Sequence, residues 1–235
     1  MSAASRQQPS TGSTRAIWLA RGAMLAQFLF TAGWVVGGLL QDAAYSPARH
    51  DISDLAALTA PHAWVMLVAQ GLAGALTIAF ALGALRPALR EPGQRGALGA
   101  WLVALSLLGL DNLSDAFIRL DCRAADPGCT AAAATTTWHG LAHALIGGMT
   151  ALLSAAAPFA LGWRMRRLQA WRDLATAMFV LGALATLALA AHVALSGGYG
   201  RGYAQRALLL VSSTGVLVLA RRVEALAIAP ANARD

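Results

Sequence analysis

Six long apolar segments, each close to the length of a membrane-spanning helix, constrain this chain more than any other feature. A helix needs roughly 20 apolar residues to cross a bilayer. We predict helices over Ile17–Leu40, His62–Leu85, Ala97–Ile118, Trp138–Trp163, Leu174–Leu195 and Ala204–Ala220. The chain is 57% hydrophobic and only 12% charged, so a soluble globule could not cover its apolar surface. The sequence therefore predicts an all-α integral membrane bundle of six transmembrane helices.

A single domain takes up nearly the whole chain. Residues 16–222 hold all six segments and form the predicted transmembrane domain. Residues 1–15 are polar and rich in Ser, Gln and Thr, which predicts a disordered cytoplasmic tail. Residues 223–235 are expected to form a second cytoplasmic tail. The first apolar segment is too long for the core of a signal peptide, so we expect it to remain as an anchor.

The distribution of basic residues predicts the orientation. All 18 are arginine, and 13 of them fall on the side that carries both termini. The other side holds only Arg49, Arg119, Arg123, Arg201 and Arg206. Cytoplasmic loops carry the excess of arginine, so both termini are expected in the cytoplasm of a bacterium, beneath its plasma (inner) membrane. The net charge of +7 forms no basic stripe with stacking aromatics, so no nucleic-acid partner is expected.

The only two cysteines, Cys122 and Cys129, lie together in a connection on the outer side, "DCRAADPGCT". An oxidising compartment and a short loop favour a disulfide between them. The alternative is a pair of thiols that bind metal or act as nucleophiles, but no second pair completes a tetrahedral sulfur site.

The stretch "TTTWHGLAHALIGG" places two histidines, His139 and His143, four residues apart. Asp111 and Asp115 have the same spacing in the preceding apolar segment. Residues four apart share one face of a helix. Ionisable groups inside a bilayer need a partner, a cavity or water, so we expect these two faces to meet near the outer surface.

Such a set of donors suits zinc or another divalent metal with a vacant position for water. The proposed ligands are His139, His143, Asp115, His62 and His192. A metal-bound water would be the hydrolytic nucleophile and Asp111 its base. Membrane lipid or an amphipathic amide would then be the substrate. Two histidines on facing helices can also hold haem iron, although all five histidines fall toward one side.

The first outer loop, "YSPARHDISDLAALTAPHAW", admits two interpretations. In the first, Ser53 or Asp54 caps a short interfacial helix that runs through Leu58 and ends at Pro61. In the second, Ser53, Asp54 and His62 fold over the histidine site, where Ser53 and Asp54 would join the catalytic residues.

The same residues also fit a structural network without catalysis. Arg206 and Arg119 are candidate partners for Asp111 or Asp115, and Asp121 belongs to the same group of pairing residues. The chain would then be a membrane module: a sensor, a small transporter, or a partner of another membrane protein or of a second copy of itself. Histidine protonation at about pH 6 would make its network pH-responsive.

Four short motifs in this order resemble a bacterial family of multi-pass membrane proteins of unknown function: "ISDLAALTAPHAW", "FIRLDC", "HGLAH" and "GYAQR". The resemblance spans roughly Trp34 to Arg222 and implies the multi-helix membrane architecture. It draws attention to Ser53, Asp54, Asp121, His139, His143, Gln205 and Arg206.

A more distant likeness is to the membrane hydrolase superfamily that includes alkaline ceramidases. It lies in the pair His139 and His143, a further His62, and Asp115. This resemblance implies metal-dependent hydrolysis of a lipid amide.

Overall fold

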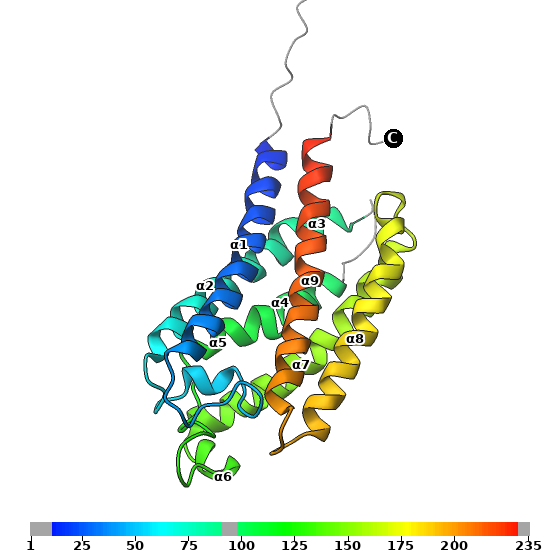
Figure 1. The fold of residues 1–235 in the computed structure, drawn as a ribbon. Helices are drawn as coiled ribbons and strands as arrows, with labels where there is room; N and C mark the ends of the chain where they lie inside the picture. Colours follow the sequence, from blue (N-terminus) through cyan, green and yellow to red (C-terminus); the bar gives the residue numbers. More distant parts are fainter. Residues whose placement is uncertain (1–10, 91–97, 230–235) are drawn as a thin grey trace, which may run out of the picture.

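The computed structural model describes residues 11–90 and 98–229, and within these ranges it contains helices and no strand. Helices α1 (Thr11–Leu39) and α9 (Arg201–Ile228) pack against each other. They carry the two ends of the described chain to the same end of the bundle (Figure 1). We call this the terminal end, and the opposite end, which carries Cys122 and Cys129, the disulfide end.

The remaining helices complete a ring. They are α2 (Ala63–Phe80), α3 (Arg86–Ala88), α4 (Leu98–Ala104), α5 (Asn112–Asp115), α6 (Ala131–Ala134), α7 (Trp138–Met165) and α8 (Ala175–Ala194). Helix α1 packs between α2 and α9, and α8 packs between α7 and α9. The segment made of α4 and α5 lies between α2 and α7 and closes the ring.

The long helices give the chain the character of a multi-pass membrane protein. Within the described residues, five helices are long and apolar enough to cross a membrane: Thr14–Leu39, Ala63–Ala88, Trp138–Met165, Gln169–Ala194 and Arg201–Ile228. Large apolar side chains such as Phe28, Leu72 and Leu145 point outward and are more than half exposed. In a membrane, lipid would cover this surface.

The helices at the two chain ends are longer than predicted. Helix α1 begins at Thr11, so Thr11–Arg15 are helical and do not belong to a disordered tail. Helix α9 continues past Arg222 to Ile228 and takes up part of the predicted second tail. The rest of the two predicted tails, apart from Ala229, lies outside the described residues. Apolar composition alone underestimated these helices because their ends carry polar and charged residues that extend beyond an apolar core.

The third predicted segment, Ala97–Ile118, is not one continuous helix. Helix α4 ends at Ala104, Ser106 has an extended backbone, and a π-helical turn over Leu107–Asp111 leads into α5. A Cβ on Gly109 would lie only 2.2 Å from the carbonyl oxygen of Ala104, so the break needs glycine at this position. Within residues 11–90 and 98–229 there are therefore five candidate spans where six were predicted.

Small residues allow the helices to approach closely. A Cβ on Gly33 of α1 would lie 2.3 Å from the Cβ of Ala69 on α2. A Cβ on Gly74 of α2 would lie 2.4 Å from the backbone nitrogen of Leu113 on α5. Association in lipid depends on such close packing, because apolar burial alone offers little advantage there.

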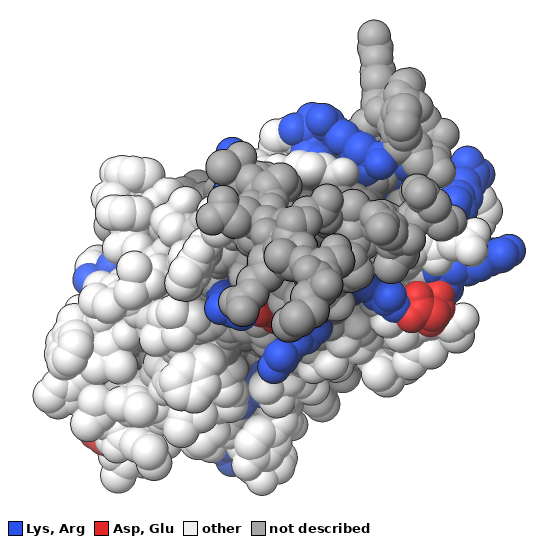
Figure 2. All heavy atoms as spheres, turned by 90° about the horizontal axis from the view of Figure 1, so that it is seen from above, with Lys and Arg blue, Asp and Glu red and all other residues white. Residues whose placement is uncertain are grey.

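Arginine side chains gather at the terminal end. Figure 2 looks onto this end and shows them around its rim, with few acidic groups beside them. Two of these arginines pair with acids: Arg21 with Glu224, and Arg222 with Asp173. Others lie over aromatic rings, as Arg86 does 5.2 Å from the ring centre of Trp101. Arginine over tryptophan is a favourable cation–π arrangement, and both residues suit a membrane–water interface.

Candidate functional site

A line of polar side chains on α7 faces the broken third segment. His143, Thr150 and Ser154 are spaced seven and four residues apart, so they share one face of the helix. All three are buried. We call this line, together with the groups that it meets on the third segment, the polar seam.

His143 meets Asp115 at the disulfide end of the seam. Its Nδ1 lies 2.9 Å from Oδ1 of Asp115 and 3.3 Å from the carbonyl oxygen of Ile118. The contact with Asp115 has the distance of an ion pair but not the direction of a hydrogen bond. The prediction that His143 faces the aspartates of the third segment is therefore confirmed.

The deeper part of the seam stabilises the helix break. The Thr150 hydroxyl donates to Oδ1 of Asp111 over 3.0 Å. Because of the break, the backbone N–H of Leu107 makes no hydrogen bond within a helix. It donates instead to the Ser154 hydroxyl over 2.9 Å. Ser154 in turn donates to the carbonyl oxygen of Thr150. Asp111 thus has a hydrogen-bond partner from α7, and its role as a catalytic base stays a prediction.

The other histidines do not reach the seam, which corrects the predicted cluster. His139 stacks on Trp138, with ring centres 3.6 Å apart. His62 lies at the start of α2 in a left-handed conformation and is exposed. His192 lies 3.8 Å from Asp51 at the far side of the disulfide end. Spacing along a helix indicated a shared face for His139 and His143, but α7 turns only His143 toward the third segment.

No metal-ligand set is formed by the residues that the structure describes: no three His, Cys, Asp or Glu side chains come together as metal ligands would. The predicted ligands are distributed over at least three separate places, because the helix ends that carry them do not converge.

The two predicted arginine partners do not contact the aspartates of the third segment. The buried guanidinium of Arg206 donates to the carbonyl oxygens of Pro47, His50 and Gly202 and to the Tyr45 hydroxyl. Arg119 donates to the carbonyl oxygens of Ala56 and Ala57. These arginines donate mainly to carbonyl oxygens of the first loop, because that loop, rather than the third segment, lies against them.

Arg206 is one of several α9 residues that hold the first loop against this helix. Gln205 accepts a hydrogen bond from the backbone N–H of Ile52, and Arg201 binds Asp51 with Nη2 and Oδ2 2.7 Å apart. A Cβ on Gly202 would lie 2.4 Å from the carbonyl oxygens of Pro47 and His50. Glycine at this position therefore permits the loop to lie directly on the helix.

Asp54 links this loop to the disulfide loop. It lies in a 3₁₀ turn, Ser53–Ala56, where neither Ser53 nor Asp54 acts as the predicted N-cap. Its carboxylate accepts from the backbone N–H of Ala124 over 2.7 Å and of Asp51 over 2.9 Å. Burial raises the pKa of Asp54, and these two donors oppose the rise without cancelling it. Asp54 thus links the two loops, and the catalytic role of Ser53 and Asp54 stays a prediction.

Asp121 caps α7 instead of pairing with an arginine. It accepts from the Thr137 hydroxyl over 2.5 Å and from the Thr137 N–H over 2.7 Å. These two hydrogen bonds, the hydroxyl first, lower the pKa of the Asp121 carboxyl. Thr137 is itself the N-cap of α7, with its hydroxyl accepting from the Gly140 N–H. Asp121 and Thr137 together fix where α7 begins, and so determine the position of His143 along the bundle axis.

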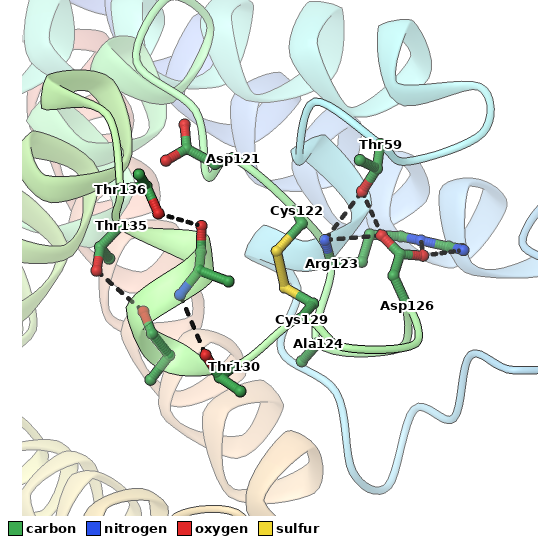
Figure 3. The surroundings of a disulfide bond; sticks show 12 residues. Thr59, Asp121, Cys122, Arg123, Ala124, Asp126, Cys129, Thr130, Thr135 and Thr136 are labelled. Atoms are coloured by element: carbon green, nitrogen blue, oxygen red, sulfur yellow. Dashed lines mark hydrogen bonds and ion pairs between the residues drawn. A yellow bond between two sulfur atoms is a disulfide. The ribbon is translucent and has the colours of Figure 1, made fainter.

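The disulfide between Cys122 and Cys129 is present, as predicted. Figure 3 shows its loop held by polar contacts beside it: Arg123 binds Asp126, and Thr59 contacts both residues. Arg123 also binds Asp42. Burial favours a higher pKa for Asp126, but the Arg123 and Thr59 hydrogen bonds outweigh it and lower the pKa. The disulfide and these contacts therefore hold the loop as a wall at the disulfide end.

A cavity of about 510 Å³ opens beside this wall. One side is polar and comes from the first loop and the start of α9, with Arg49, His50, Asp51, Asp54 and Arg201. Pockets of this volume hold small molecules in many proteins. Ser53 also lines it, whereas His139, His143 and His62 do not.

The opposite side of the cavity is mainly apolar. Leu120, Ala131, Ala134, Ala144 and the disulfide form most of it, and Thr130 and Thr135 also line the cavity there. The cavity thus lies between a charged wall and an apolar wall, which is the arrangement that an amphipathic ligand needs.

Several of these residues escaped prediction. Thr150 and Ser154 follow His143 at helical spacing, and that period was a usable signal for the polar seam. Arg49, His50, Asp51 and Arg201 carry no motif, because loop packing rather than sequence spacing brings them together.

Comparison with models of protein families matches residues 24–222 to a family described as "Protein of unknown function (DUF998)". Neither a curated protein nor a solved structure matches the chain. The likeness to alkaline ceramidases is not shown by these comparisons.

Proposed function

The chain belongs to the DUF998 family of proteins of unknown function, and we propose that it is a membrane protein that binds a small ligand in the cavity at its disulfide end. The observation that carries this proposal is the cavity of about 510 Å³ between a charged and an apolar wall. Binding without catalysis is the activity that the residues around it support best.

We propose that the disulfide end faces away from the cytoplasm. Arginines concentrate at the terminal end, which fits the rule that cytoplasmic surfaces of membrane proteins are rich in basic residues. The Cys122–Cys129 disulfide suits an oxidising compartment on the other side. In a bacterium the cavity would then open outside the plasma membrane.

The contacts around the cavity favour binding over hydrolysis. A serine nucleophile needs a base within hydrogen-bond reach. Within the described residues, the Ser53 hydroxyl has no hydrogen bond to a histidine or a carboxylate, and His50 uses Nδ1 to accept from the Ser46 N–H. Asp54 is engaged by two backbone amides. These residues shape a binding surface rather than activate a nucleophile.

The proposal is tested by filling the cavity. Ala134→Trp would place an indole in the space that Ala134 lines. The matched control is Ala132→Trp, on the same short helix but at an exposed position outside the cavity. Both proteins are extracted from membranes in neutral detergent, and native mass spectrometry detects small molecules that remain bound.

We expect a bound molecule on the wild type and on Ala132→Trp, and its loss from Ala134→Trp while the circular dichroism spectrum of the folded protein is unchanged. Equal retention by both variants would place the ligand elsewhere and overturn the proposal. A protein that carries no bound molecule, and takes up none from a total extract of membrane lipids and metabolites, would also overturn it.

A further inference from the structure

Among the described residues, Arg49 is a cation of the cavity that has no partner. Arg201 binds Asp51 through Nε and Nη2, and its Nη1 donates to Ser196. Asp54 is occupied by backbone amides. Arg49 is exposed, and its guanidinium makes no hydrogen bond or ion pair with any residue of the described chain.

This arrangement selects for an acidic group in the ligand. The carboxylates of the cavity are already neutralised or hydrogen-bonded, so a cationic group would find few free acceptors. An acidic group would meet the guanidinium of Arg49 and the remaining N–H donors of Arg201. Arginine recognises phosphate in particular, because its planar fork matches two phosphate oxygens.

The apolar wall selects for a hydrocarbon chain. Ala144 lies six residues into α7, which places it about 9 Å along the helix from Trp138. Its neighbours Leu141 and Leu145 are 52% and 66% exposed on the outside of the bundle. The apolar wall therefore continues from the loops at the disulfide end to the outer surface of the bundle that lipid would cover. A soluble metabolite would not need such a continuous apolar surface.

We infer that the cavity binds a single-chain lipid with an acidic headgroup, with the headgroup against Arg49 and Arg201 and the chain along Ala134 and Ala144. This inference rests on the proposed function and names the chemical class of its ligand. A phosphate headgroup can come from a lipid or from a soluble phosphate ester, so the experiment separates the two sources.

Three probes are added to the purified full-length protein in neutral detergent: monooleoylglycerol phosphate, monooleoylglycerol without the phosphate, and glycerol phosphate without the chain. Native mass spectrometry gives the bound fraction as each is titrated. The variant is Arg49→Gln, and the control is Arg221→Gln, an exposed arginine at the terminal end. Ala134→Trp reports whether each bound probe occupies the cavity.

We expect the acidic lipid to bind the wild type about tenfold more tightly than monooleoylglycerol, since a charge-assisted hydrogen bond contributes on this order. It should also bind more tightly than glycerol phosphate, which lacks the chain that would be buried along the apolar wall. Arg49→Gln should weaken only the acidic lipid, by about tenfold, and Arg221→Gln should change nothing. Equal weakening by the two arginine variants would overturn the assignment to Arg49.

The remaining outcomes distinguish an error in this inference from an error in the proposed function, on which it rests. If glycerol phosphate binds as tightly as the acidic lipid, or if the neutral lipid does, the ligand class is wrong although the cavity still binds. If Ala134→Trp leaves the binding of every probe unchanged, the cavity is not the binding site and the proposed function fails as well.

Discussion

His143 on α7 and Asp115 on α5 bring an imidazole nitrogen and a carboxylate oxygen to within 2.9 Å of each other in a buried part of the bundle. Removing one member of a buried pair leaves the other without compensation, which commonly costs about 3 kcal/mol or more. We therefore expect His143→Ala to lower the free energy of unfolding by about 3 kcal/mol.

The control for this prediction is His139→Ala, one turn away on the same helix. His139 is only partly buried and contacts Trp138, so its loss should cost well under 1 kcal/mol, as is usual near the surface. Unfolding in detergent, followed by circular dichroism, measures both. Equal effects of the two variants would show that the contact with Asp115 adds nothing to stability.

The Thr150 hydroxyl gives a second test of the polar seam. Thr150→Val keeps the shape of the side chain but removes the donor to Asp111, and an unsatisfied buried acceptor costs about 1–3 kcal/mol. Thr150→Ser keeps the donor and should recover most of that loss. The same unfolding measurement decides between them, and a serine variant as unstable as the valine variant would contradict the role of the hydroxyl.

Asp121 predicts a specific dependence of stability on pH. Its pKa is lowered in the folded protein by the Thr137 hydroxyl and N–H. The unfolded chain therefore binds a proton more readily at acid pH, so the stabilisation is complete above the unfolded pKa of about 3.9 and disappears as the pH falls through the lower folded value.

The difference in melting midpoint between the wild type and Asp121→Asn should accordingly be constant from about pH 7 to pH 5 and shrink below about pH 4. Thermal unfolding over this range measures it. Because Asp42 and Asp126 titrate equally in both proteins, the difference isolates Asp121. A difference that stays constant down to the lowest pH would refute the cap as its source.

Gly202 connects the fold to the cavity. An added Cβ would lie 2.4 Å from two loop carbonyl oxygens, so Gly202→Ala should push the first loop from α9 and cost about 1–3 kcal/mol, as overpacking usually does. Gly148→Ala is the control, since a Cβ there meets nothing within 4 Å. We expect Gly202→Ala also to weaken ligand binding in the mass-spectrometric assay. Binding and stability like those of Gly148→Ala would exclude this role of the loop contact.

Composition and apolar length were sufficient to predict an all-helical membrane protein. The short loop between the cysteines predicted the disulfide, and four-residue spacing predicted the meeting of His143 with Asp115. They were insufficient where a backbone conformation decides the outcome. The break at Ser106 depends on a hydroxyl 48 residues away on α7, and no local pattern reveals that contact.

The candidate site was less predictable than the fold for the same reason. Helical spacing identifies which residues share a face, but it does not say which way that face turns. His139 and Arg206 were therefore assigned to the aspartates, while the structure places one beside Trp138 and the other beneath the first loop. The cavity lies where loops meet the ends of α6, α7 and α9, and no sequence period predicts how loops pack there.

The interrupted third segment also affects how the protein is made. Asp115 contacts His143, Asp111 accepts from Thr150, and the N–H of Leu107 donates to Ser154; the ribosome adds all three of these α7 residues later. Until α7 emerges, the segment would expose these polar groups to hydrocarbon, where each costs several kcal/mol by order of magnitude. The third segment and α7 should therefore leave the translocon together, as a pair, rather than one helix at a time.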